Sequence, residues 1–189
     1  NGLACKRPIE FSPQIQPIIP TPDHGTLPSG HATEGSIFAY VLWRLMKESG
    51  SKTYKDLGLF EQLMRQGERI AINRTVAGVH FPVDSAAGAI LGVQLGQYLV
   101  ARCMDKKKEE KALSGWSFDG KKYKGSEDFS IWNVIKSGEN DAGELKKTDY
   151  SASQNNTVDL GENSGSFAQV AVDAMTYDGQ LYGMPYSTE

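Results

Sequence analysis

Residues 73–96, NRTVAGVHFPVDSAAGAILGVQLG, hold the end of one predicted helix, a turn, and the start of the next helix. Pro82 marks the boundary, because proline is favoured in the first turn of a helix and disrupts its interior. Gly88, Gly92 and Gly96 follow at four-residue spacing. Residues at this spacing share one helix face, and their missing side chains allow another helix to approach closely. The stretch therefore predicts two helices joined by a short turn, the second packed against a further helix.

Around this stretch the chain predicts three helices, over residues 30–47, 60–76 and 83–111. Ser29 is the expected N-cap of the first helix, because its hydroxyl can accept a hydrogen bond from a free backbone N–H. The first helix carries an apolar stripe at helical spacing, which consists of Ile37, Phe38, Val41, Leu42 and Leu45. These segments predict a mainly α fold, a helical bundle.

The segments on either side of the helices have a different character. Residues 8–28 hold six of the eight prolines, which predicts an extended, rigid connector. From Ser114 onward, glycine, serine, asparagine and aspartate separate short aromatic pieces, which predicts an irregular tail with short strands or one short helix. We therefore expect two parts, a helical domain over residues 1–113 and an appendage over 114–189. The appendage is acidic, because no lysine or arginine follows Lys147.

Composition excludes several classes of function. The chain has 189 residues, of which 39% are hydrophobic, enough for one full domain. Its net charge of −3 gives no indication of nucleic-acid binding. It has no uninterrupted run of about 18 apolar residues, so we expect a soluble protein without a membrane span. Cys5 and Cys103 could form one disulfide, but two cysteines are not a disulfide framework.

Ser29, Gly30 and His31 form the first candidate site segment. A serine and a glycine that open a helix place a hydroxyl and free backbone N–H groups where the helix dipole favours an anion. His31, in the first turn, could act as a general acid or base. Taken alone, this tripeptide favours an ordinary helix start that carries a surface histidine.

Arg74, His80 and Asp84 form the second segment. His80 and Asp84 are four residues apart across a helix start, so the carboxylate can hydrogen-bond one imidazole nitrogen and leave the other as a nucleophile or ligand. Arg74 ends the preceding helix and can clamp an oxyanion with two N–H groups. The alternative is a histidine paired with a helical carboxylate for structural reasons, with Arg74 on the surface.

In combination, these segments resemble the vanadium-dependent haloperoxidases and the type 2 phosphatidic-acid and bacterial acid phosphatases, a single superfamily known as PAP2. The family pattern is Lys-x6-Arg-Pro, then Pro-Ser-Gly-His, then Ser-Arg-x5-His-x3-Asp. The chain shows, in this order, Arg7-Pro8, Pro28-Ser29-Gly30-His31 and Asn73-Arg74-x5-His80-x3-Asp84. The match covers residues 7–84, and the glycine-rich helix after it is in keeping with the family.

The chain departs from the family pattern at two positions. Asn73 stands where the family usually has serine. The motif lysine would stand immediately before Asn1, so we expect this chain to be the later part of a longer protein. The tail is not covered by the resemblance.

The resemblance implies a role for each matching residue. Arg7 and Arg74 would hold the oxygens of vanadate or phosphate, and Ser29 and the Gly30 backbone N–H would add hydrogen bonds. His80 would be the covalent partner, either as the axial ligand of vanadium in vanadate or as a phosphohistidine nucleophile.

The two remaining matched residues would assist His80. His31 would be the acid–base residue, and Asp84 would orient His80.

The stretch before the serine favours a haloperoxidase. In the haloperoxidases that the chain resembles, the position five residues before the serine lines the halide pocket, and histidine there is typical of bromoperoxidase-like members. Here that position is His24. We therefore expect vanadate as cofactor, and hydrogen peroxide, bromide or iodide, and a small organic acceptor as substrates. The alternative for His24 is a solvated loop histidine.

Three alternatives stay open beside this expectation. The first is a soluble acid phosphatase that acts on a phosphomonoester through a phosphohistidine. The second is an incomplete fragment that folds but does not turn over. The third concerns the tail, which could be a homo-oligomerisation or docking arm. The resemblance favours a periplasmic or secreted location.

Overall fold

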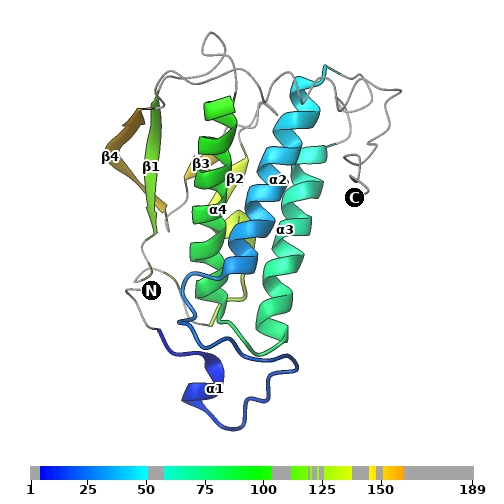
Figure 1. The fold of residues 1–189 in the computed structure, drawn as a ribbon, viewed down its shortest axis with the longest axis vertical. Helices are drawn as coiled ribbons and strands as arrows, with labels where there is room; N and C mark the ends of the chain where they lie inside the picture. The colour runs from blue at the N-terminus through cyan, green and yellow to red at the C-terminus, as the bar shows by residue number, and fades with distance from the viewer. Residues whose placement is uncertain are drawn as a thin grey trace, which may run out of the picture.

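Three long helices form the body of the protein: α2 (Gly30–Glu48), α3 (Leu59–Val76) and α4 (Pro82–Cys103) (Figure 1). The computed structural model describes residues 5–50, 58–103, 112–118, 120, 123, 126–137, 145–147 and 151–159. Within these residues the mainly α prediction is confirmed. The predicted continuation of the last helix to residue 111, and the arm proposed for the end of the chain, lie largely outside them.

Helix α2 lies between α3 and α4 and packs against both, whereas α3 and α4 touch little (Figure 1). The predicted glycine face of α4 is the contact with α2. A Cβ atom on Gly88 would lie 2.5 Å from the carbonyl oxygen of Ser29, and one on Gly92 would overlap the carbonyl oxygen of Thr33. The absence of side chains at these glycines is therefore what lets the two backbones meet.

A second close contact joins α2 to α3, and the sequence analysis missed it. A Cβ atom on Gly67 would lie 3.1 Å from the carbonyl oxygen of Gly35. Helix α2 contacts α3 through its own Gly35, and it contacts α4 through the glycines of α4. Both contacts are close, and the buried residues of α2 are mostly small.

The apolar stripe of α2 is not its buried face. Phe38 is 71% exposed, and Leu42 and Leu45 are only half-buried. The buried residues are instead Ala32, Thr33, Gly35, Ser36, Ala39, Tyr40, Trp43 and Met46. Close backbone approach on two sides requires small side chains there, so the larger aliphatic residues are displaced outward.

The proline-rich connector contains one helical turn, α1 (Pro8–Phe11), where an entirely extended segment was expected. Pro8 occupies the first helical position, where its missing N–H costs no hydrogen bond. Glu10 accepts a hydrogen bond from the Arg7 backbone N–H at 2.6 Å. The connector then runs beneath the long helices, and the Ile18 N–H donates to the Ala77 carbonyl at 3.2 Å.

After α4 the chain forms short strands, as predicted. Strands β1 (Ala112–Phe118) and β4 (Ser151–Asp159) pair antiparallel, with an irregularity in register between Ser114 and Trp116. Strands β2 (Ile135–Ser137) and β3 (Leu145–Lys147) form a second antiparallel pair. The one-turn helix α5 (Ile131–Val134) precedes β2.

Helix α5 belongs to the same core as the long helices. Ile131 and Val134 are fully buried and share one hydrophobic cluster with Trp43 and Phe60. The Ile131 N–H also donates to a carboxylate oxygen of Glu68 on α3 at 2.9 Å. Residues beyond 113 therefore contribute core contacts to the helices.

Two further expectations can be compared with the described residues. Cys5 and Cys103 are both free thiols, so they do not form the disulfide that was considered. A helix with the length and hydropathy of a membrane span does not occur in the part of the chain that the structure describes.

Candidate functional site

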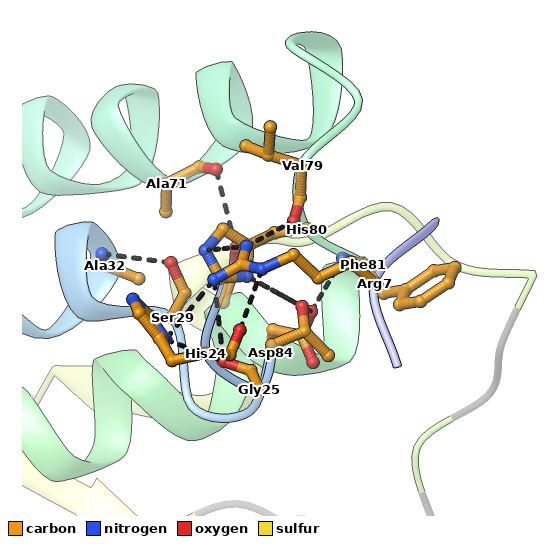
Figure 2. A network of polar contacts seen from close by, with 12 residues as sticks. Arg7, His24, Gly25, Ser29, Ala32, Ala71, Val79, His80, Phe81 and Asp84 are labelled. Atoms are coloured by element: carbon orange, nitrogen blue, oxygen red, sulfur yellow. Dashed lines mark hydrogen bonds and ion pairs between the residues drawn. The ribbon is translucent and has the colours of Figure 1, made fainter. Parts of the chain in front are cut away.

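His80 lies in the turn between α3 and α4, and its side chain is buried, with 4% of its surface exposed. Gly78 makes this turn possible, because its φ of 76° lies in the left-handed region that side chains disfavour. The Val79 N–H donates to the Arg74 carbonyl at 3.2 Å and closes the turn. The chain thereby directs the imidazole inward at the N-terminal end of α4 (Figure 2).

Asp84 and Thr26 hold one side of the His80 ring. The Nδ1 atom of His80 lies 3.3 Å from Oδ2 of Asp84 and 3.0 Å from Oγ1 of Thr26. The Thr26 hydroxyl donates to the same Asp84 oxygen at 2.5 Å, and the Phe81 N–H donates to it at 2.8 Å. The spacing of His80 and Asp84 thus brings the two together, as the sequence suggested.

Arg7 lies on the other side of the ring and is almost fully buried (Figure 2). Its Nε donates to the His24 carbonyl at 3.0 Å, and its Nη1 donates to the Val79 carbonyl at 2.8 Å. Its contact with Nε2 of His80 is longer, at 3.5 Å, and so is that of Nη2 with the Gly25 carbonyl, also at 3.5 Å. The two shorter hydrogen bonds therefore fix the guanidinium. The two longer contacts are weak, so N–H groups of Arg7 beside the His80 ring could still donate to another acceptor.

The charge of Arg7 is opposed by its burial. Desolvation lowers the pKa of Arg7, and the positive charge of Arg74 adds to this, whereas the Asp84 carboxylate raises it. A guanidinium starts from so high a pKa that it stays charged at neutral pH. The site therefore contains a buried positive charge beside Nε2 of His80.

His24 is exposed, but its ring contacts the same guanidinium (Figure 2). Its Nδ1 lies 3.4 Å from Nη2 of Arg7 and 3.0 Å from the Gly25 carbonyl oxygen. His24 therefore lies at the solvent-exposed edge of the site, beside Arg7.

The N-terminus of α2 borders the site, and Ser29 is its N-cap, as predicted. Ser29 is fully buried, its hydroxyl accepts a hydrogen bond from the Ala32 N–H at 3.4 Å, and its own N–H donates to the Asp84 carbonyl at 3.0 Å. Gly30 is exposed, and a Cβ atom there would meet nothing within 4 Å. The first backbone N–H groups of this long helix thus lie where an anion could approach them.

His31 and Arg74 complete the set of predicted residues. His31 is exposed in the first turn of α2, and partial desolvation lowers the pKa of its imidazole. The charges of Arg74 and, more weakly, His80 lower this pKa further, while Glu34 raises it. The Nε of Arg74 is buried and has no hydrogen-bond partner among the described residues. His31, Arg74 and His80 therefore lie close enough to influence one another electrostatically.

Thr26 is the site residue that the sequence analysis missed. It stands three positions before Ser29, inside the stretch that was considered for His24. Loop threonines are usually solvated, so only the burial of Thr26 and its contacts with His80 and Asp84 identify it.

Taken together, the site comprises one buried imidazole whose Nε2 is not held by Asp84 or Thr26, two arginines, a helix N-terminus and two exposed histidines at its edge. This set can bind a tetrahedral oxyanion and offer it a nitrogen ligand or nucleophile. Neither a search among curated proteins nor one among solved structures gave a significant match. The family model of the PAP2 superfamily, whose members are typically phosphatases or haloperoxidases, matches residues 3–109, more than half of the 189 residues. The chain therefore belongs to the PAP2 superfamily.

Proposed function

We propose that this protein is a vanadium-dependent haloperoxidase that oxidises halide, preferably bromide or iodide, with hydrogen peroxide. The observation that carries the proposal is the position of Arg7 between two imidazoles. Nε2 of His80 lies 3.5 Å from one guanidinium nitrogen, and Nδ1 of His24 lies 3.4 Å from the other. The charge of Arg7, which could bind an anion, thus lies beside the candidate nitrogen ligand His80 and the candidate halide-pocket residue His24.

The donor set fits vanadate. Arg74 has a buried Nε without a partner among the described residues, and a buried donor of this kind needs an acceptor. His80 would ligate vanadium through Nε2, and Arg7, Arg74, Ser29 and the Gly30 N–H would hold the oxygens. Vanadate bound in this way would supply a Lewis-acid centre that activates peroxide.

The residues of the chain would then manage protons and halide. The lowered pKa of His31 favours its neutral imidazole, which can accept a proton from hydrogen peroxide. His24 and Arg7 would place the halide near positive charge. In the overall reaction, peroxide is reduced to water and bromide is oxidised to hypobromous acid, which halogenates a small organic acceptor.

A phosphatase is the second candidate, and the lowered pKa of His31 favours an acid phosphatase. In this reaction His80 would attack the phosphorus of a phosphomonoester, and His31 would protonate the leaving alcohol. Since the pKa of His31 is lowered, the protonated imidazole exists mainly at acidic pH. The phosphatase would therefore work best in acid, and its rate would fall as the pH rises through that pKa.

The decisive experiment measures bromination of an organic dye by the protein with vanadate, peroxide and bromide. We expect a vanadate-dependent rate that excess phosphate suppresses and that His80→Ala abolishes. Gln66→Ala, an exposed change on α3, is the control and should keep the rate. Hydrolysis of p-nitrophenyl phosphate without vanadate-dependent bromination would contradict the proposal and favour the phosphatase. Absence of both reactions would favour the incomplete fragment.

His24→Phe tests the halide pocket separately. An aromatic residue at this position is typical of chloroperoxidase-like members of the family, so the variant should shift selectivity from bromide towards chloride. A tenfold change in the ratio of the two kcat/KM values, about 1.4 kcal/mol, would establish the role. An unchanged ratio would make His24 a loop histidine without a part in halide choice.

A further inference from the structure

The hydroxyl of Thr26 lies between the two residues that the sequence pairs directly. Its Oγ1 is 3.0 Å from Nδ1 of His80 and 2.5 Å from Oδ2 of Asp84. The direct distance between Nδ1 and Oδ2 is longer, at 3.3 Å. The better hydrogen bonds therefore run through Thr26.

The number of hydrogens on each group determines which atom donates and which accepts in these hydrogen bonds. An ionised carboxylate only accepts, so the single hydroxyl hydrogen of Thr26 must point at Asp84. Oγ1 then has only lone pairs left for His80, and Nδ1 must carry a hydrogen and donate it. In a neutral imidazole the other nitrogen, Nε2, is then unprotonated. The arrangement selects one tautomer, with the Nε2 lone pair facing Arg7.

The surroundings hold Thr26 in this position. Its side chain is 2% exposed, and its backbone N–H donates to the Cys5 carbonyl at 3.0 Å. Arg7 fixes the two preceding residues through the carbonyls of His24 and Gly25. A β-branched side chain also has few rotamers, so the hydroxyl cannot easily turn away.

We infer that Thr26 is the positioning residue that selects the Nδ1–H tautomer of His80 and transmits the charge of Asp84 to it. The inference rests on the proposed function only in its prediction for vanadate binding, and the tautomer of His80 can be measured independently of that function. Asp84 acts mainly through the hydroxyl, and the longer direct contact is secondary. Loss of the hydroxyl should therefore affect His80 even though both members of the pair remain.

The test compares Thr26→Val, which keeps the shape and removes the hydroxyl, with Thr26→Ser, which keeps the hydroxyl. The chain has three histidines, so the ring ¹⁵N signals can be assigned with His24→Gln and His31→Gln. Where the His80 ring is neutral, the wild type and Thr26→Ser should show Nδ1–H and unprotonated Nε2. Thr26→Val should show a mixture of tautomers or the reverse tautomer. An unchanged Nδ1–H signature in folded Thr26→Val would overturn the inference.

Thr75→Val is the matched control, because the Thr75 hydroxyl is also buried and has no hydrogen-bond partner among the described residues. It should leave the His80 signals unchanged, and a change there would show that any buried threonine has this effect. If Thr26→Val does not fold, Thr26→Ala provides the same comparison.

Binding of inorganic vanadate gives the second readout. Thr26→Val should weaken it about 10–100-fold, the usual effect of removing a group that orients a ligand, and Thr26→Ser should restore it. If the wild type binds no vanadate, the proposed function fails, while the tautomer measurement still decides the role of Thr26.

Discussion

Arg74 lies in the last turn of α3 with a buried Nε that has no acceptor within the described residues. Its charge lowers the pKa of both Arg7 and His31. These effects mean that the two arginines repel each other across the site and that a bound oxyanion would relieve the repulsion.

Arg74→Gln should raise the pKa of His31. The positive charge of Arg74 disfavours the imidazolium, so its removal favours protonation, although partial desolvation still keeps the value below that of a free histidine. A titration of the His31 ring signals by NMR measures the shift. Arg65→Gln, which removes an exposed arginine paired with Glu61, is the control and should leave the titration unchanged. A fall in the His31 pKa in Arg74→Gln would contradict the placement of Arg74 beside it.

At the scale of elements, the spacing of glycines predicted α4 and its contact face well. Glycines repeated along one helix face have few explanations other than close helix packing. The apolar stripe of α2 does not mark its buried face, although large aliphatic residues normally do. In α2 the packing against α3 and α4 selects small residues, and this could not be known before Gly35 and Gly67 were seen to meet.

Gly92→Ala should destabilise the protein by about 1–3 kcal/mol, the usual cost of overpacking a tight contact. The added methyl would overlap the Thr33 carbonyl, and this outweighs the gain in helix propensity of about 1 kcal/mol. Urea unfolding measures the difference.

Gly35→Ala is the matched control, because a methyl there meets its nearest atoms at 3.5 Å, an ordinary contact distance. It should be neutral or slightly stabilising. Equal losses in both variants would mean that the α2–α4 contact is no tighter than the α2–α3 contact.

At the scale of the whole molecule, the expected division near residue 113 does not separate the hydrophobic contacts. Phe129, Ile131 and Val134 are buried in one cluster with residues of α2, α3 and α4. The segment around α5 thus helps to hold the helices whose ends carry Ser29 and His80. The division into a helical domain over residues 1–113 and an appendage over residues 114–189 stays a prediction.

Ile131→Ala should lower the free energy of unfolding by about 2–5 kcal/mol, because it leaves a cavity at a fully buried position. Asn133→Ala, at an exposed position on the same turn, should change it by less than about 0.5 kcal/mol. The two variants are compared by urea unfolding followed through helical circular dichroism. A loss below about 1 kcal/mol in Ile131→Ala would show that α5 is not part of the core that stabilises the helices.

Local sequence signals were enough to predict the three long helices, the N-cap Ser29 and the residues that could bind an oxyanion. These are local properties, since capping, proline placement and side-chain chemistry depend on near neighbours along the chain. The assignment of Arg7, His31, Arg74 and His80 to one site also depended on the family resemblance.

Tertiary packing alone places Thr26 between His80 and Asp84, brings His24 to Arg7 and buries the small residues of α2. Each of these features joins segments far apart in the chain, 54 positions in the case of Thr26 and His80. Spacing along a sequence describes which residues share an element, whereas hydrogen bonds and burial between elements depend on how the whole chain packs.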